Sequence, residues 1–236
     1  MRIIALILLP LSLFTSQPFF AFFTPPPGWV LGDPQTLQGG AKVGFVASKR
    51  KAISPSIVMT IENIGEADLE TYMKAVARLH KKKTYRELGA IPSKAGIGKI
   101  IQIDEKHEWG VSRMLQAITL VSGHAIILAG VTPKEEFLTY HQALLKAFQS
   151  LTVAPTLCAS CRDSQLSEKV TEMMICWKKY RLSSTAPPST LFSSTLFQKN
   201  QWEPFVDYVK NSLKSQGSCW QFLAIRSTYE TLINGE

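Results

Sequence analysis

The stretch RMLQAITLVSGHAIILAGVTP, residues 113–133, decides the fold of this chain. It joins two runs of apolar and β-branched residues, Val111 to Leu120 and His124 to Val131, through the turn sequence VSGH. Two such runs on either side of a glycine-containing turn are typical of a β-hairpin. A third run, Lys99 to Glu105, precedes them across the polar turn EKHEWG. The sequence therefore predicts an antiparallel meander here.

Further strands are predicted before the meander. Gly44 to Ser48 and Ser56 to Ile64 read as a strand pair joined by the basic turn SKRKAISP. The second of these alternates apolar and polar residues, as a half-buried strand does. Tyr85 to Ile91 predicts one more strand, which Pro92 is expected to end.

Two helices are predicted to pack on this sheet. The first opens at Glu66, and its apolar residues recur at helical spacing. The second has Thr132 as its cap and Pro133 in its first turn. The expected buried stripe of the first helix is Leu69, Tyr72, Met73, Val76 and Leu79, and that of the second is Phe137, Leu138, His141, Leu144, Leu145 and Phe148.

Four segments in this order carry a resemblance to a known family: PPPGW, DLETYMKAVARL, the hairpin quoted above and FLTYHQALLKAFQSL. They resemble the PsbP-like/Mog-type fold, a grouping that includes lumenal photosystem accessory proteins, Ran-binding proteins and small exported bacterial proteins of unknown function. The resemblance spans Thr24 to Val153 and includes no catalytic motif. It implies an α+β fold, with an antiparallel sheet flanked by helices. It also implies an exported, non-catalytic binding or assembly factor of unknown ligand.

No functional residue is carried over from that grouping. The acidic surface expected of a Ran binder is absent, because this segment has a net positive charge. The extended N-terminal arm expected of a photosystem factor is not matched either. The resemblance therefore bears on the fold more than on the function.

The first 21 residues, MRIIALILLPLSLFTSQPFFA, have the pattern of a secretory signal peptide. A basic residue, Arg2, precedes an apolar run, and a small residue, Ala21, stands at the exit. The run is shorter than the ~20 residues of a membrane-spanning helix, and Pro10 interrupts it. We therefore predict a signal peptide over residues 1–21 and a bacterial protein exported to the periplasm or secreted. An uncleaved anchor and a buried N-terminal helix are the alternatives.

The remainder divides into a sheet domain over residues 22–153 and a helical region over residues 154–236. Apolar stripes at helical spacing lie on both sides of a Ser/Thr/Pro connector at residues 183–197. Ser218 is expected to cap the last helix. The tryptophans of this region, Trp177, Trp202 and Trp220, are expected to be core residues.

The chain is basic, with 26 Lys and Arg against 18 Asp and Glu and a net charge of +8. Its 45% hydrophobic content is typical of a folded globular protein and excludes a disordered tail. Basic clusters suit an anionic surface, although cations that close a helix are also ordinary. We predict a protein partner of unknown identity and a possible anionic surface, and expect no nucleic acid. The candidate anion contacts are Lys49, Arg50, Lys51, Lys81, Lys82 and Lys83.

The segment TLCASCRDS contains two of the four cysteines in a C-x-x-C spacing. In an exported chain an even number of cysteines favours disulfides, and the candidates are Cys158, Cys161, Cys176 and Cys219. A thiol-disulfide oxidoreductase is the alternative, although that chemistry places the motif inside a βαβ unit. Reduced structural thiols are a further alternative. A zinc site is disfavoured because the other two cysteines are far apart in the sequence.

No catalytic residue is predicted. Ser48-x-x-Lys51 matches a serine–lysine spacing, but the accompanying motifs of penicillin-interacting enzymes are missing. The four histidines show no metal-ligand spacing. We therefore expect neither a metal nor a cofactor. The alternatives to a binding factor are the oxidoreductase and a secreted factor that contacts an anionic membrane or a host protein.

Overall fold

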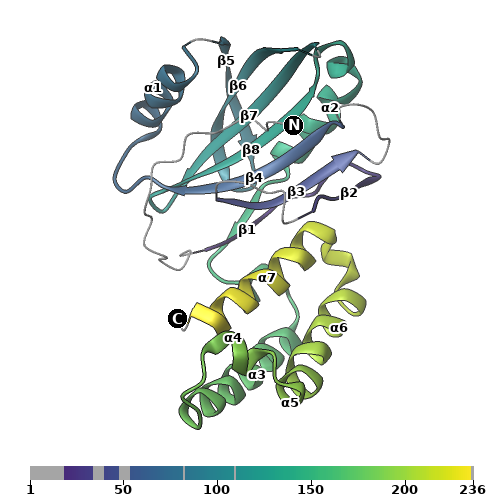
Figure 1. The fold of residues 1–236 in the computed structure, drawn as a ribbon. Helices are drawn as coiled ribbons and strands as arrows, with labels where there is room; N and C mark the ends of the chain where they lie inside the picture. The colour runs from purple at the N-terminus through teal and green to yellow at the C-terminus, as the bar shows by residue number, and fades with distance from the viewer. Residues whose placement is uncertain (1–18, 34–39, 48–53, 82, 109, 235–236) are drawn as a thin grey trace. The chain divides into compact units, whose positions relative to one another are not determined.

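The structure is a computed structural model, and it describes residues 19–33, 40–47, 54–81, 83–108 and 110–234. These residues form two compact units (Figure 1). The sheet unit comprises the described residues from Phe23 to Thr152. The helical unit combines the segment that ends at Phe22 with the residues from Val153 onward. Most of the predicted signal peptide lies outside the described residues.

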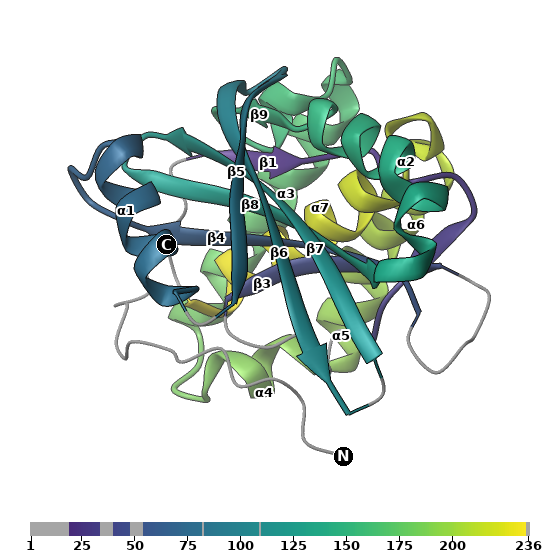
Figure 2. The same cartoon turned by 90° about the horizontal axis from the view of Figure 1, so that it is seen from above.

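The described part of the sheet unit contains a seven-stranded antiparallel sheet in the order β2-β3-β4-β8-β7-β6-β5. The meander predicted from the sequence is present as β6, β7 and β8 and is seen from above in Figure 2. The predicted α+β fold class, with a C-terminal helical region, is confirmed. The strands are β2 (Trp29–Leu31), β3 (Ala41–Ala47), β4 (Ser56–Asn63), β5 (Thr84–Ser93), β6 (Gly96–His107), β7 (Gly110–Val121) and β8 (His124–Pro133).

The turn between β7 and β8 is a two-residue loop. Val121 and His124 are paired, and the residues between them, Ser122 and Gly123, have φ angles of 47° and 73°. Positive φ at both central positions matches the right-handed twist of the flanking strands. The turn sequence VSGH therefore sets the register of the hairpin.

Helix α1 (Leu69–Leu79) packs on one face of the sheet. The carboxylate of Asp68 caps the helix by accepting a hydrogen bond from the Thr71 N–H at 2.7 Å. Alternate residues of β6 and β7 point toward this helix because the side-chain period of a strand is two. The resulting buried cluster is Met73, Ile101, Ile103 and Ile118.

The opposite face is covered by α2 (Phe137–Gln149), which follows the short helix η2 (Lys134–Glu136). Gly130 of β8 allows this close packing, since an added Cβ would lie 2.6 Å from Cδ2 of Leu144. One residue of the predicted α2 stripe is wrong: Leu138 is 85% exposed. The other apolar residues of the helix determine which of its faces is buried, and Leu138 lies outside that face. The fully buried side chains between α2 and the sheet include Phe45, Ile57, Met59, Leu115, Leu144 and Phe148.

Strand β5 departs from the sequence-based prediction. Pro92 was expected to end it, but the strand continues through Pro92 to Ser93. A proline fits here because β5 lies at the edge of the sheet, where its missing N–H removes no required hydrogen bond. The pairing of β5 with β6 also contains a bulge between Glu87 and Gly89, and Gly89 has a φ of 111°.

The helical unit begins with a two-stranded sheet of β1 and β9. Among the described residues, no helix is both long and apolar enough to cross a membrane. The elements are β1 (Phe20–Phe22), β9 (Thr152–Ala154), η3 (Cys158–Ser160), α3 (Ser164–Leu182), α4 (Pro188–Phe192), α5 (Thr195–Phe197), η4 (Gln198–Trp202), α6 (Glu203–Asn211), η5 (Lys214–Gln216) and α7 (Ser218–Asn234).

The segment read as a Ser/Thr/Pro connector, residues 183–197, contains two short helices and supplies core residues. Phe197 is fully buried, and its ring lies 5.0 Å from that of Trp177. Phe192 contacts Trp202 at 5.0 Å and Tyr229 at 4.8 Å. Aromatic rings at such separations attract one another beyond the burial of their surface. The short helices therefore depend on an aromatic cluster that spans α3, α4, α5, η4 and α7.

We expect Gly98→Ala to destabilise the sheet unit by about 1–3 kcal/mol. An added Cβ would lie 2.5 Å from the backbone oxygen of Ile118, which cannot move away as a side chain can. Gly32→Ala is the matched control, since its Cβ would meet Gly44 O at 3.4 Å. Urea unfolding of both full-length variants tests this, and equal midpoints would show that β6 and β7 are not this close.

Candidate functional site

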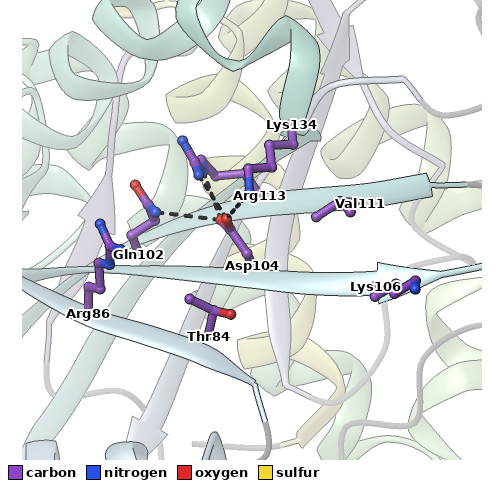
Figure 3. Close-up of a pocket in the computed structure, with 8 residues that line it drawn as sticks. All are labelled: Thr84, Arg86, Gln102, Asp104, Lys106, Val111, Arg113 and Lys134. Carbon is purple, nitrogen blue, oxygen red and sulfur yellow. Dashed lines mark hydrogen bonds and ion pairs between the residues drawn. The ribbon is translucent and has the colours of Figure 1, made fainter.

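A polar pocket of about 280 Å³ lies on the α2 side of the sheet, where β5, β6 and β7 run beside η2 (Figure 3). Gln102, Asp104 and Lys106 are two positions apart on β6 and so point to the same face. Residues of β5 and β7 that lie across from them, together with one residue of η2, complete the wall. The lining residues are Thr84, Arg86, Gln102, Asp104, Lys106, Val111, Arg113 and Lys134.

Asp104 is the central group of the pocket and is only 8% exposed. Arg113, its cross-strand partner, donates two parallel hydrogen bonds to the carboxylate, from Nε to Oδ1 and from Nη2 to Oδ2, both at 2.7 Å. Lys134 Nζ lies 3.0 Å from Oδ2. These contacts lower the pKa of Asp104 from 3.8 to about 2, with the Arg113 hydrogen bonds as the largest cause. The carboxylate therefore stays ionised at neutral pH.

Arg113 is held from a second side. Its guanidinium carbon lies 4.9 Å from the centre of the Phe137 ring, at the start of α2. A guanidinium over an aromatic face is attracted to the negative potential of the ring. The hydrogen bonds to Asp104 raise the pKa of Arg113 further above its ordinary value. Arg113 is thus a fixed cation that joins β7, β6 and the first turn of α2.

Two further cations, Arg86 on β5 and Lys106 on β6, line the pocket and are exposed. Neither forms an ion pair with a carboxylate of the described residues. The lining thus has four cations and one carboxylate, a formal excess of three positive charges. An arrangement of this kind attracts an anion.

The anion contacts predicted from sequence are not the residues that form this pocket. Lys49, Arg50, Lys51 and Lys82 lie outside the described residues. Lys81 is exposed after α1, and Lys83 is paired with Glu105 at 2.8 Å. The sequence contains one signal for the pocket, the polar residues at alternate positions in QIDEK of β6. The identity of their cross-strand partners becomes visible only with the register.

The predicted disulfide framework is not found. The four cysteines are thiols, and each of them lies in the described chain. Cys158 opens the single turn of η3 and is half-buried, whereas Cys161 follows that turn and is buried. Cys176 and Cys219 lie on the separate helices α3 and α7. The turn is instead held by Ser160, whose Oγ accepts a hydrogen bond from Trp220 Nε1 at 2.7 Å.

The geometry also disfavours the oxidoreductase alternative. Burial, followed by the nearby charge of Asp163, raises the pKa of the Cys161 thiol. The attacking cysteine of a C-x-x-C redox site, which is the first of the pair, commonly lies at the N-terminus of a helix, where its thiolate is stabilised. Here Asp163 caps α3 and accepts a hydrogen bond from the Leu166 N–H at 2.9 Å. The C-x-x-C motif therefore precedes the helix and does not occupy its N-terminus.

The histidines are dispersed. His80 is buried, and burial lowers its pKa. His107 hydrogen-bonds Ser112 Oγ at 2.8 Å, and His124 Nδ1 lies 2.8 Å from the Ser122 carbonyl oxygen. Within the described chain, no three His, Cys, Asp or Glu side chains come together as metal ligands.

We expect Asp104→Asn to lower stability at pH 7 by about 1–3 kcal/mol, because Arg113 and Lys134 lose their shared counter-ion. The folded-state pKa of Asp104, about 2, lies below its ordinary value of 3.8. Asp104 therefore stabilises the fold above about pH 4, and this contribution is lost as the pH falls to about 2.

Urea unfolding at pH 7, 4 and 2.5 tests this expectation, and the variant should lose less stability on acidification than the unmodified protein. Glu70→Gln is the control, because its partner Lys74 is an exposed i,i+4 neighbour. A parallel acid loss in the unmodified protein and the Asp104→Asn variant would contradict the expectation.

We expect a soluble thiol reagent at neutral pH to modify Cys158 and Cys176 at least ~10-fold faster than Cys161 and Cys219. The first two are half-buried and the other two are buried. Time-resolved mass spectrometry of labelled peptides measures the order. Faster labelling of Cys161 or Cys219 than of Cys158 and Cys176 would contradict the expectation.

The comparisons with known proteins concern fold. No family model matches the sequence, and no curated protein matches it. Among solved structures, the chain is similar to LpqN of Mycobacterium tuberculosis, described as involved in cell envelope biogenesis (13% identity, 58% of this chain and 84% of that chain, TM-score 0.46). It is also similar to the PsbP protein (CyanoP) of Synechocystis sp. PCC 6803 (15% identity, 57% and 86%, TM-score 0.41).

A third similar structure is the Ran-binding protein Mog1p of Saccharomyces cerevisiae (14% identity, 53% and 86% of the two chains, TM-score 0.37). The solved structures that this chain resembles thus include those of the grouping suggested by its sequence pattern. The likeness is a Mog1/PsbP-like fold at low sequence identity.

Proposed function

We propose that this protein is exported and acts as a non-catalytic binding protein, which holds a carboxylate group of a protein partner in the pocket of β5, β6, β7 and η2. The observation that supports this proposal is the charge of the pocket. Asp104, the only carboxylate among the described lining residues, already has two cationic partners, while Arg86 and Lys106 form no ion pair within the described chain.

The chemistry of the lining favours binding over catalysis. A general base works best when its pKa lies near the working pH. Asp104 has a pKa of about 2, and the residues that line the pocket include neither histidine nor cysteine. The cationic side chains of the pocket serve to attract and orient an anion.

A carboxylate from a protein fits the pocket better than an extended polyanion. The guanidinium of Arg86 offers the planar fork that pairs with a carboxylate, and Gln102 and Thr84 add neutral hydrogen-bonding groups. The volume of about 280 Å³ is at the lower end of ligand pockets. It suits one acidic side chain or a chain terminus.

Export is supported by the sequence of residues 1–21, whose basic start and short apolar run are typical of a secretory leader. A secreted factor that contacts an anionic membrane is the alternative. Of the basic residues proposed for such a contact, Lys83 is paired with Glu105.

We expect Arg86→Gln/Lys106→Gln to weaken binding of a capped tetraglutamate peptide about tenfold, since each lost ion pair in a half-open pocket costs roughly 0.5–1 kcal/mol. Isothermal titration calorimetry at low salt measures the affinity. Crosslinking in the native cell, followed by mass spectrometry, then tests whether the same variant loses a protein partner.

Lys81→Gln/Lys146→Gln is the matched control, because it also removes two positive charges, from exposed positions outside the pocket. It should change the affinity less than about twofold. An equal loss in both variants would show that net charge, and not this pocket, attracts the peptide.

A further inference from the structure

The N-terminal strand β1 is part of the core of the helical unit. It pairs with β9 in a two-stranded sheet. The residues at its start are nearly inaccessible: Phe19 and Phe20 are each 6% exposed, and Ala21 is 5% exposed. A leader that is removed after export has no reason to contribute buried side chains to the folded protein.

The contacts of Phe20 lead to the centre of this unit. Its ring lies 6.1 Å from that of Trp220 in an edge-on arrangement, and 5.8 Å from that of Phe22. Trp220 is fully buried on α7, and its indole N–H donates the hydrogen bond to Ser160 of η3. Phe20, Trp220 and Ser160 therefore connect β1, α7 and the C-x-x-C turn.

These contacts conflict with a leader that ends at Ala21. Cleavage after Ala21 would remove Phe19, Phe20 and Ala21, and would leave Phe22 as the first residue of the mature chain. Most of the strand that pairs with β9 would be lost, and the Trp220 ring would lose its contact with Phe20. A large aromatic side chain removed from a packed core leaves a cavity that is strongly destabilising.

We infer that the native protein retains Phe19–Phe22 as a structural strand, so that any processing of the exported chain occurs N-terminal to Phe19. This inference rests on the proposed export in one respect: only an exported chain is expected to have a leader that is removed. The retention of the strand itself is inferred from the burial of its residues and from the contact between Phe20 and Trp220. It also makes the helical unit discontinuous, because its first strand and its helices come from opposite ends of the sequence.

The direct test is mass spectrometry of the N-terminal peptide of the protein isolated from its native cell. A first residue at Phe19 or earlier, including an intact Met1, supports the inference. A first residue at Phe20 or later overturns it. Cell fractionation of the same material tests export separately, so that the two proposals can fail independently.

A second measurement uses full-length substitutions. We expect Phe20→Ala to lower the melting temperature of the helical unit by at least about 10 °C, because a buried ring is replaced by a cavity. Phe22→Ala is the matched control: it changes the same residue type on the same strand at a more exposed position, and should have less than half the effect. Equal melting temperatures for Phe20→Ala and the unmodified protein would overturn the inference.

Discussion

The register of β6, β7 and β8 is the constraint on which the sheet unit depends. Since the side-chain period of a strand is two, one register assigns every residue of β6 to a face. Ile101 and Ile103 then pack against α1, while Gln102 and Asp104 point to the α2 side. A slip of one residue would bring a carboxylate into the apolar cluster and an isoleucine into the pocket. The two-residue turn at Ser122 and Gly123 fixes the register of β7 with β8, the next pair in the sheet.

The buried carboxylate of Asp104 determines which cations of the pocket have a partner. A carboxylate with so little exposure requires charged or hydrogen-bonding partners, and Arg113 and Lys134 supply them. These two cations are thereby held by the fold. Arg86 and Lys106 have no such partner in the described chain and stay accessible. The division between structural and accessible cations is the physical basis for the proposed recognition of an anion.

The helical unit is organised by aromatic contacts and by one hydrogen bond. Trp220 binds Ser160 through its indole N–H and packs against Phe20, so that three separate segments meet at one side chain. Ser160 lies between the two cysteines of the C-x-x-C motif. The motif is therefore part of a turn held by its serine, and burial of Cys161 makes its thiol harder to ionise.

Local patterns in the sequence determined the α+β fold class, the β7–β8 hairpin and the two helices of the sheet unit, because these depend on neighbours two to four residues apart. They did not reveal the pairing of Asp104 with Arg113, the position of Arg86 or the core role of Phe192 and Phe197. Nor did they reveal that β1 joins the far end of the chain. Only the tertiary structure decided these features, since cross-strand register and long-range packing depend on residues distant in sequence, which no local period records.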